Sequence, residues 1–230
     1  MTKIIEVHEE LENSDPNYVE LYKRFGYAET TSPWSDIAEK FPSPCRILEL
    51  GCGCGYISVP LLRLGYEVVG VDANPEMLKV AKEACPNLET ITSRIEDLAL
   101  DKKFNLVILS PLIFNRANDS IRLKIIEKAV AHLDINGFLG IQLLRPSWLN
   151  KSQVYDSPNQ KVIYESFDDN YLIGSGNIIY YFEDIHYVER FIAQGFDDET
   201  LETYLKKWGL IVCKKIIINP IEYICFATLK

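Results

Sequence analysis

The sequence predicts an α/β fold with a doubly wound, mostly parallel sheet, and three observations support this class. Short apolar runs suited to strands covered on both faces alternate with helical patterns through the first 144 residues. A glycine-rich turn follows the first of these runs, at residues 51–55. The chain has 230 residues, of which 47% are hydrophobic, enough to bury the core of one domain.

Five apolar runs predict the parallel strands of this sheet, at residues 46–50, 67–71, 88–92, 105–109 and 138–144. A helix is expected to begin at Pro75, with Asn74 as its N-cap. Another helix is expected before the fifth strand, where apolar residues share one face, and Asn136-Gly137 should end it.

An aromatic-rich segment follows the fifth strand and predicts a small antiparallel lid. Residues 148–196 contain 11 of the 26 aromatic residues of the chain. Strands are expected at 161–167, 177–182 and 186–192, with turns at Gly174-Ser175-Gly176 and Glu183-Asp184. After this segment, Asp197 or Asp198 should cap a helix that runs through Trp208 and ends at Gly209, before a strand pair at 210–218 and 222–228.

We therefore expect a single domain, residues 1–230, in four parts. These are an N-terminal helical cover at 1–44, a ligand-binding core at 45–144, the lid insertion at 145–197, and a C-terminal helix and strand pair at 198–230. An aromatic lid would exclude water and shape an apolar pocket, although any single aromatic residue there is more often part of a packed core.

The glycine turn and the acid after the second strand predict a nucleoside site. Glycines at 51, 53 and 55 let the backbone approach a ligand closely, because they have no Cβ atom. Asp72 ends the neighbouring parallel strand, so its carboxylate should lie beside this turn and reach ribose hydroxyls. A dinucleotide fingerprint requires glycine at the sixth position from Gly51, where this chain has Tyr56. A nicotinamide oxidoreductase is therefore a distant alternative.

The residues Glu49-Leu50-Gly51-Cys52-Gly53-Cys54-Gly55 resemble motif I of the class I S-adenosylmethionine-dependent methyltransferases, and the similarity continues through most of residues 45–144. The resemblance implies a Rossmann-like, seven-stranded sheet with S-adenosyl-L-methionine as cofactor. It also implies that Asp72 binds the ribose and that the turn lies along the methionine part of the cofactor, with Glu49, Gly51, Cys52, Gly53 and Gly55 as the binding residues.

Further cofactor contacts follow from the same resemblance. Ala73 and Met77 should flank the adenine, Ile95 should pack on the ring, and Ser110 should line the site from the end of the fourth strand. Many small-molecule members have a tyrosine in a helix before the first strand, and Tyr22 or Tyr27 is the candidate here. The chain departs from the family at Arg94, where an acid that bonds the adenine amino group is often found, and we assign Arg94 no role.

The acceptor is expected to be a small molecule, or alternatively a peptide end, methylated on oxygen or nitrogen. The net charge of −9 and the pI near 5.0 argue against a nucleic-acid substrate, which requires a basic surface. Ser110-Pro111-Leu112-Ile113 lacks the Asn- or Asp-Pro-Pro-aromatic motif of amino-methylating DNA and protein-glutamine enzymes, and no cysteine near that strand end suits pyrimidine C5 methylation. The alternative is a catalytically silent protein that binds S-adenosylmethionine or acts as a scaffold.

His186 is the candidate general base, because it is the only histidine in the lid segment, although a structural role is the commoner one for such a residue. Six cysteines without a Cys-x-x-Cys motif, and only three histidines, predict no metal site; Cys52 and Cys54 occupy the cofactor turn. No apolar run is long enough to span a bilayer and no secretion signal is evident, so we expect a cytoplasmic protein with no membrane partner. The sequence does not predict an oligomeric state.

Overall fold

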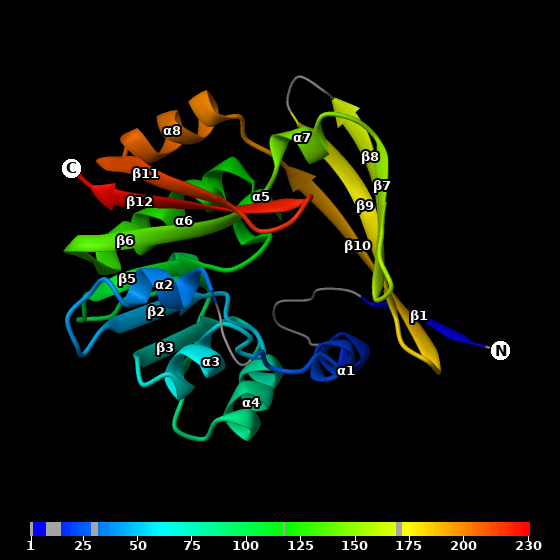
Figure 1. Ribbon diagram of the computed structural model, residues 1–230, viewed down its shortest axis with the longest axis horizontal. Helices are drawn as coiled ribbons and strands as arrows, with labels where there is room; N and C mark the ends of the chain where they lie inside the picture. The colour runs from blue at the N-terminus through cyan, green and yellow to red at the C-terminus, as the bar shows by residue number, and fades with distance from the viewer. Residues whose placement is uncertain (1, 8–14, 29–31, 117, 169–171) are drawn as a thin grey trace.

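Figure 1 shows a computed structural model of the chain, in which residues 2–7, 15–28, 32–116, 118–168 and 172–230 are described. The described residues form two sheets, one of seven strands and one of five. The seven-stranded sheet lies between layers of helices, and the five-stranded sheet stands beside it (Figure 1).

The larger sheet has the order β11 (Leu210–Ile217), β12 (Glu222–Leu229), β6 (Leu133–Leu144), β5 (Phe104–Leu109), β2 (Arg46–Leu50), β3 (Glu67–Asp72) and β4 (Glu89–Thr92). Strands β2 to β6 pair in parallel, and β12 pairs antiparallel with both β6 and β11. The chain leaves β2 toward β3 on one side and later returns to β5 on the other. Ligands of open α/β sheets bind at such a reversal point.

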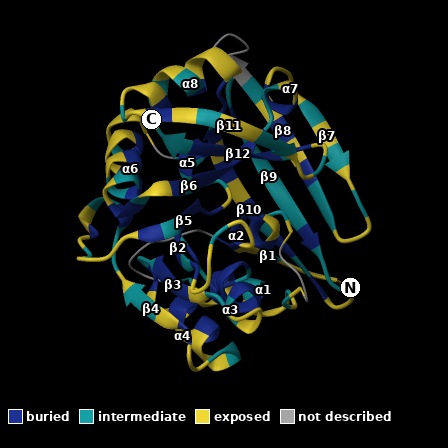
Figure 2. Cartoon of the chain, turned by 60° about the vertical axis from the view of Figure 1, so that its left-hand side comes forward, coloured by how far each residue is buried: buried dark blue, intermediate teal, exposed yellow. Residues whose placement is uncertain are grey.

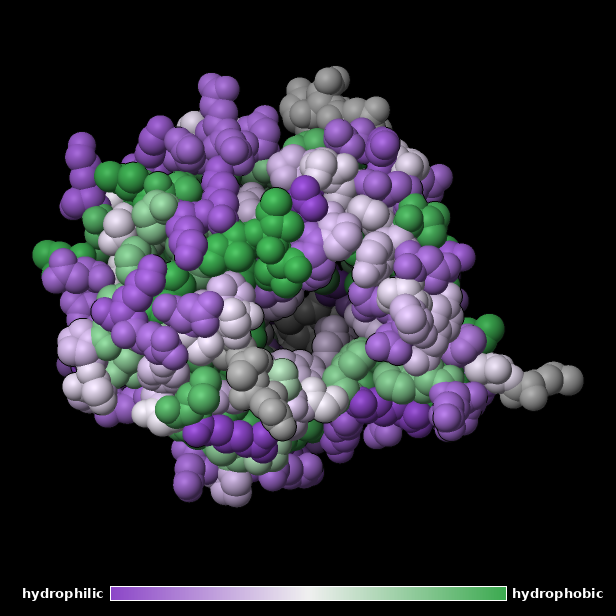
Figure 3. All heavy atoms as spheres, in the orientation of Figure 1, coloured by the Kyte–Doolittle hydropathy of each residue, from purple (hydrophilic) through white to green (hydrophobic). Residues whose placement is uncertain are grey.

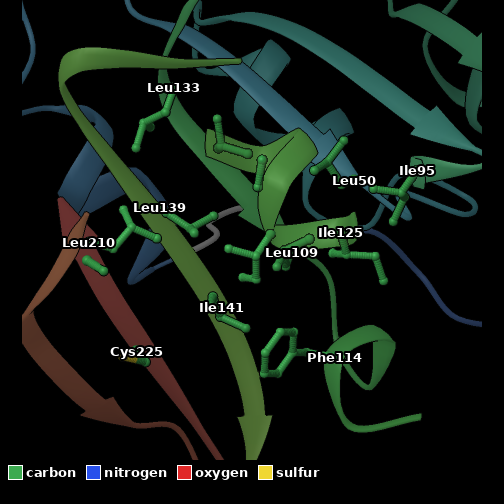
Figure 4. Close-up of a cluster of buried hydrophobic side chains, with 14 of the residues drawn as sticks. Leu50, Ile95, Leu109, Phe114, Ile125, Leu133, Leu139, Ile141, Leu210 and Cys225 are labelled. Carbon is green, nitrogen blue, oxygen red and sulfur yellow. The ribbon is translucent and has the colours of Figure 1, made fainter. Parts of the chain in front are cut away.

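Helices cover both faces of this sheet, which confirms the predicted α/β class. One face packs against α2 (Trp34–Ala38), α3 (Ser58–Arg63) and α4 (Pro75–Ala84). The other packs against α6 (Asp119–His132) and α8 (Asp198–Lys206). Figure 4 shows Leu50, Leu109 and Ile141 of three strands meeting Ile125 of α6 in this second core layer. Strands buried on both faces explain the continuous apolar runs in the sequence.

The smaller sheet has the order β1 (Lys3–Val7), β10 (Ile185–Gln194), β9 (Ile173–Tyr181), β8 (Gln160–Asp168) and β7 (Gln153–Asp156). It is antiparallel except for the pairing of β1 with β10. Strand β10 alternates buried and more exposed residues. Figure 2 shows the strands of this sheet as a mixture of buried, intermediate and exposed residues. One face of the sheet packs on the rest of the protein, with α1 (Pro16–Lys23) and α7 (Pro146–Leu149) against it.

The turn predicted at Gly174-Ser175-Gly176 is wrong, because these residues lie inside β9. A Cβ atom at Gly174 would come within 2.4 Å of the Tyr164 ring, and one at Gly176 within 2.7 Å of the Phe191 ring. These glycines therefore make room for aromatic rings on neighbouring strands. The second predicted turn, Glu183-Asp184, does separate β9 from β10.

Two further expectations differ from the structure. Asn136-Gly137 does not end a helix, because α6 ends at His132 and both residues lie in β6, at an irregularity in the β5–β6 register. Residues 1–44 are not purely helical, since Lys3–Val7 forms β1. Tyr171, one of the aromatic residues of the predicted lid, lies outside the described residues. Within the part of the chain that is described, no helix is long and apolar enough to cross a membrane.

Candidate functional site

A cavity of about 730 Å³ opens at the carboxyl ends of β2, β3 and β5. Its wall is completed by α1, η1 (Ile95–Asp97), α5 (Ile113–Arg116) and the first turns of α6. Figure 3 shows the surface of the molecule hollowed between the two sheets. The volume falls within the range of roughly 300–1,000 Å³ that is usual for small-molecule sites.

The glycine turn forms the floor of one end of this cavity. Gly51, Gly53 and Gly55 all have positive φ, at 77°, 50° and 82°, which favours glycine. A Cβ atom on Gly51 would lie 1.8 Å from Ile113 Cδ1, so Gly51 allows α5 to approach the turn. The amides of Gly51 and Cys52 donate to Val71 O at 2.8 and 2.9 Å. The hydrogen bonds of these two amides are therefore made within the protein, and the contribution of Gly51 is the space that its missing side chain leaves.

Asp72 lies beside the turn, as its position in the sequence predicts. Its Oδ2 accepts from the Gly53 amide at 2.7 Å and its Oδ1 accepts from the Asn74 amide at 2.9 Å. Each carboxylate oxygen can accept more than one hydrogen bond, so a half-buried Asp72 in the cavity wall retains capacity for vicinal hydroxyls.

Glu49 lies at the base of the same end and is only 1% exposed. Its Oε1 accepts from Ser110 Oγ at 2.6 Å, and its Oε2 accepts from Ser58 Oγ. Burial raises the pKa of Glu49 to about 7; the two serine hydroxyls lower it and the charge of Asp72 raises it further. Burial and the two carboxylates also raise the pKa of the Cys52 thiol well above its ordinary value.

Two walls flank the space next to Asp72. Ala73 and Met77 follow β3 on one side, and Ile95 of η1 lies opposite in the lining. The Asn74 side chain caps α4 by accepting from the amides of Glu76 and Met77, at 3.0 and 3.2 Å, which fixes this wall. An apolar slot beside a carboxylate that can accept hydrogen bonds from vicinal hydroxyls suits a flat purine base.

The other apolar residues of the cavity wall come from several elements. They are the aromatic residues Tyr18, Tyr22 and Tyr56 and the aliphatic residues Leu112, Ile113, Ile121 and Ile125. Leu112 has a φ of 68°, a left-handed conformation that costs a non-glycine residue about 1–2 kcal/mol. Strain of this kind at a cavity wall is typical of a functional position.

A buried ion pair connects the cavity wall to the smaller sheet. Glu189 of β10 is 1% exposed, and its Oε1 accepts from Arg116 Nη2 at 2.7 Å. Its Oε2 accepts from the hydroxyls of Tyr180, at 3.0 Å, and Tyr22, at 3.5 Å. Tyr22 and Arg116 line the cavity, so Glu189 links α1, α5 and β10 around it.

Ten of the predicted site residues line this one cavity: Tyr22, Glu49, Gly51, Cys52, Gly53, Asp72, Ala73, Met77, Ile95 and Ser110. The structure does not bring the other three to it. A Cβ atom on Gly55 would meet Val59 and Ala81 in the core, at 3.0 and 3.2 Å. The Tyr27 hydroxyl donates to Cys54 O at 2.7 Å from behind the turn. Burial raises the pKa of Tyr27 to about 12.

His186 lies on the other face of β10 from Glu189. Residues 185, 187 and 189 are buried, whereas His186 is only partly buried and packs edge-on against Tyr181 at 4.8 Å. It pairs across the sheet with Tyr181 and Ile4, and it is not part of the cavity lining. The strand period of two residues explains this position, since a one-residue step reverses the side-chain direction.

Sequence reasoning missed several lining residues. Tyr18 lies one helical turn before Tyr22, and that spacing was a usable signal. Arg94, which received no role, lines the cavity and donates to Glu96 at 3.0 Å. Arg116 meets Glu189 across 73 residues, so no local pattern indicates their contact.

The cavity suits the predicted cofactor in three respects. It combines a turn whose glycines leave backbone exposed, a carboxylate next to an apolar slot, and an aromatic wall. A Cβ atom on Gly53 would meet only the end of the Met77 side chain, at 3.4 Å, so this position is kept open on the cavity side. Within the described residues, no cluster of three or more His, Cys, Asp or Glu side chains could hold a metal ion.

Comparisons with known proteins agree with this geometry. Residues 47–137 match the family described as "Methyltransferase domain". A magnesium-protoporphyrin O-methyltransferase of Rhodobacter capsulatus is 34% identical over 80 residues, which cover 33% of this chain and 36% of that protein. A 23S rRNA (uracil(1939)-C(5))-methyltransferase of Shewanella sp. (strain ANA-3) is 47% identical over 58 residues, covering 24% of this chain and 13% of that protein. The chain spans less than half the length of the curated relatives that it matches.

A solved structure extends the similarity of fold to nearly the whole chain. CalS10, described as an amino pentose methyltransferase from Micromonospora echinaspora with S-adenosylmethionine bound, superposes with a TM-score of 0.69. The match covers 97% of this chain and 100% of that one, at 15% identity. Residues 47–137 therefore match a methyltransferase domain, and nearly the whole chain has the fold of a methyltransferase solved with S-adenosylmethionine bound.

Proposed function

We propose that the protein transfers a methyl group from S-adenosylmethionine to an oxygen or nitrogen atom of a small molecule. The observation that carries the proposal is the continuity of the cavity. The same cavity is lined by the glycine turn and Asp72 and by the apolar residues that include Tyr22 and Ile113. When bound, the cofactor supplies an electrophilic methyl group on a sulfonium centre. A small-molecule acceptor bound against these apolar residues would therefore share one cavity with the cofactor.

The residues of the chain would act by binding, alignment and exclusion of water. Asp72 would accept hydrogen bonds from the ribose, and Ala73, Met77 and Ile95 would hold the base. Tyr18, Tyr22 and Tyr56 would surround the reacting centre with aromatic faces, which favour a cation. In-line transfer gains most of its rate from such alignment, so the proposal does not require a base.

The properties of the chain favour a small acceptor over RNA. One relative is an rRNA C5-methyltransferase, but the match covers 13% of that protein. The net charge of −9 is unfavourable for phosphate binding. No described cysteine lies at the end of β5, where Ser110 and Pro111 follow the strand. The names of two relatives, an O-methyltransferase and an amino pentose methyltransferase, support oxygen or nitrogen as the nucleophile. A cytoplasmic location is part of this proposal.

The test is to incubate the protein with S-adenosylmethionine and a panel of small amines, phenols and carboxylic acids. Formation of S-adenosylhomocysteine together with loss of one acceptor supports the proposal. Binding of the cofactor without turnover on any panel member, or on cell-extract metabolites, would favour the catalytically silent alternative. Methyl incorporation into RNA alone would overturn the small-molecule assignment.

A further inference from the structure

Glu49 is a buried carboxyl group, and the proposed alignment of cofactor and acceptor does not account for its presence in the cavity wall. It is 1% exposed and lies in the cavity lining directly before the glycine turn. It accepts from the hydroxyls of Ser58 and Ser110 and from the backbone amide of Ser58, and it forms no ion pair with any residue that the structure describes. A buried carboxylate without a cation is costly, so its retention in the wall of a binding cavity suggests a role toward the ligand.

The charges around the cavity are unevenly distributed. Arg94 lies against Glu96, with 3.0 Å between Nε and Oε1, and Arg116 lies against Glu189. At the glycine-turn end, the charged groups of the lining are the carboxylates of Glu49 and Asp72. The amides of Gly53 and Asn74 donate to Asp72, whereas those of Gly51 and Cys52 donate to Val71 O and do not offset this negative charge. That end of the cavity therefore favours a cationic ligand.

Methyl transfer changes the charge of the cofactor at this end. The S–CH₃ bond breaks, its electron pair stays on sulfur, and a lone pair of the nucleophile forms the new bond to the methyl carbon. A nucleophile that carried a proton releases it to solvent. A sulfonium cation becomes a neutral thioether, while adenine, ribose and the amino-acid group stay the same. A negative charge in the cavity wall would therefore bind the donor more tightly than the product.

We propose that Glu49 sets the preference of this cavity for the cationic methyl donor over its neutral product, and that uptake of a proton by the Glu49 carboxyl removes this preference. The inference rests on the proposed function, since it requires the cofactor to occupy the cavity. The groups that face Glu49 are Ser58 of α3, Ser110 after β5, Asp72 of β3 and Cys52 of the turn. Of these, Asp72 and Cys52 are titratable.

The pH range follows from the state of Glu49 in the free protein. Burial raises its pKa to about 7, so the group is mostly protonated at pH 6 and mostly ionised at pH 8. Affinity for S-adenosylmethionine should rise across this range relative to that for S-adenosylhomocysteine. By linkage, the bound cation lowers the pKa of Glu49, so binding at pH 7 releases protons. Cys52 does not titrate in this range, because burial raises the pKa of its thiol well above the ordinary value.

The experiment is calorimetric titration of both ligands from pH 6 to pH 8. We expect the ratio of the two affinities to rise roughly tenfold in the wild-type protein, as one charge a few ångströms from the sulfonium would give. In Glu49→Gln the ratio of the two affinities should stay at the value that the wild type has at low pH. Any change of this ratio with pH that remains in the variant comes from the ligands themselves. Repeating the titration at pH 7 in buffers of different ionisation enthalpy should show proton release in the wild type that the variant lacks.

Two further variants test the assignment. Glu96→Gln removes another carboxylate from the same cavity; the bonds of Glu96 to its own amide and to Arg94 outweigh the effect of burial and lower its pKa. In Glu96→Gln the ratio of the two affinities should change with pH as in the wild type and differ from it by a constant factor. Ser110→Ala removes a hydroxyl that lowers the pKa of Glu49, so the midpoint of the profile should move to higher pH.

The outcomes separate this inference from the proposed function. If both ligands bind and Glu49→Gln reproduces the wild-type profile, Glu49 does not discriminate between them and the inference is overturned. If the Ser110→Ala midpoint stays unchanged, the titrating group is not Glu49. If neither ligand binds the folded wild-type protein at any pH, the proposed function fails first. Circular dichroism of each variant verifies the fold.

Discussion

In the seven-stranded sheet, β2 and β5 are buried along nearly their whole length, whereas β10 of the five-stranded sheet buries every second residue. The first sheet supplies the glycine turn, Glu49 and Asp72 to the cavity from the ends of adjacent strands. The second contributes Glu189, which acts on the cavity through Arg116 and Tyr22. One half of the site is therefore built by local sequence, and the other by contacts between distant segments.

The largest effect is expected from Gly53→Val, which would abolish cofactor binding while leaving the fold largely intact. The substitution places a branched side chain at a position with a φ of 50°, next to Met77 Cε at 3.4 Å. The left-handed backbone costs a residue with a Cβ atom about 1–2 kcal/mol. Calorimetry with S-adenosylhomocysteine and circular dichroism must be read together.

Gly209→Val is the matched control, because Gly209 has a φ of 72° and no atom within 4 Å of its Cβ position. It should lower stability by a similar amount and leave binding unchanged. Full binding by the folded Gly53→Val protein would place the ligand elsewhere. An unfolded Gly53→Val protein would show only that Gly53 is structural.

Glu189→Ala tests whether the second sheet depends on its buried ion pair. Removing one partner leaves the guanidinium of Arg116 poorly compensated, so we expect a loss of about 3–5 kcal/mol in the free energy of unfolding. Urea denaturation measures the change. The control is Arg190→Ala on the opposite face of the same strand, where the ion pair with Glu6 is exposed and contributes about 0–1 kcal/mol. Equal effects of the two substitutions would show that Glu189 contributes no more to stability than a residue of an exposed ion pair.

Glu49→Gln should stabilise the ligand-free protein at high pH. The folded pKa of about 7 lies above the ordinary value of 4.5, so the stability that this group contributes is fully present below about pH 4.5 and is lost as pH rises through 7. At pH 8 the variant should therefore be more stable by about 3 kcal/mol, with a much smaller difference at pH 5. Urea titrations at the two pH values test this. A difference that does not change with pH would contradict a titrating Glu49.

Asp72→Ala should weaken S-adenosylhomocysteine binding by about 1.5–3 kcal/mol, the loss typical of hydrogen bonds to a charged group. Because Asp72 also holds the amides of Gly53 and Asn74, Asp72→Asn is the milder comparison and should lose less. Calorimetry measures both affinities. Unchanged affinity in a folded Asp72→Ala protein would remove Asp72 from the site.

The smallest effect is expected from His186→Ala. His186 lies outside the cavity lining, on the face of β10 opposite Glu189, and its described contact is with Tyr181. Stability should change by less than about 0.5 kcal/mol, as for other surface positions, and turnover with an acceptor from the panel should stay within about twofold. A fall in turnover of about 10²–10⁴-fold in the folded variant would restore His186 as a general base.

The first half of the site could be predicted because its parts are close in sequence. A strand, a turn and the end of the next parallel strand place Glu49, Gly53 and Asp72 at one edge of the sheet, whatever the rest of the chain does. The helix caps at Asn74 and Asp197 were likewise predictable from local residues, whereas the last helix ends at Lys206 and not at Gly209 as expected. The Gly174-Ser175-Gly176 error has the opposite origin, because rings from β8 and β10 determine the need for glycine there.

The sequence by itself determined the α/β class, the parallel pairing of the strands that end at Leu50 and Asp72, and the acid beside the glycine turn. These features depend on periodicity and on residues within one strand-helix-strand unit. Only the tertiary structure decided that Gly55 and His186 point away from the cavity, that β1 joins the smaller sheet, and that Glu189 meets Arg116 and Tyr22. The two contacts of Glu189 join residues that are 73 and 167 positions apart, so they are determined by tertiary packing and not by a local sequence pattern.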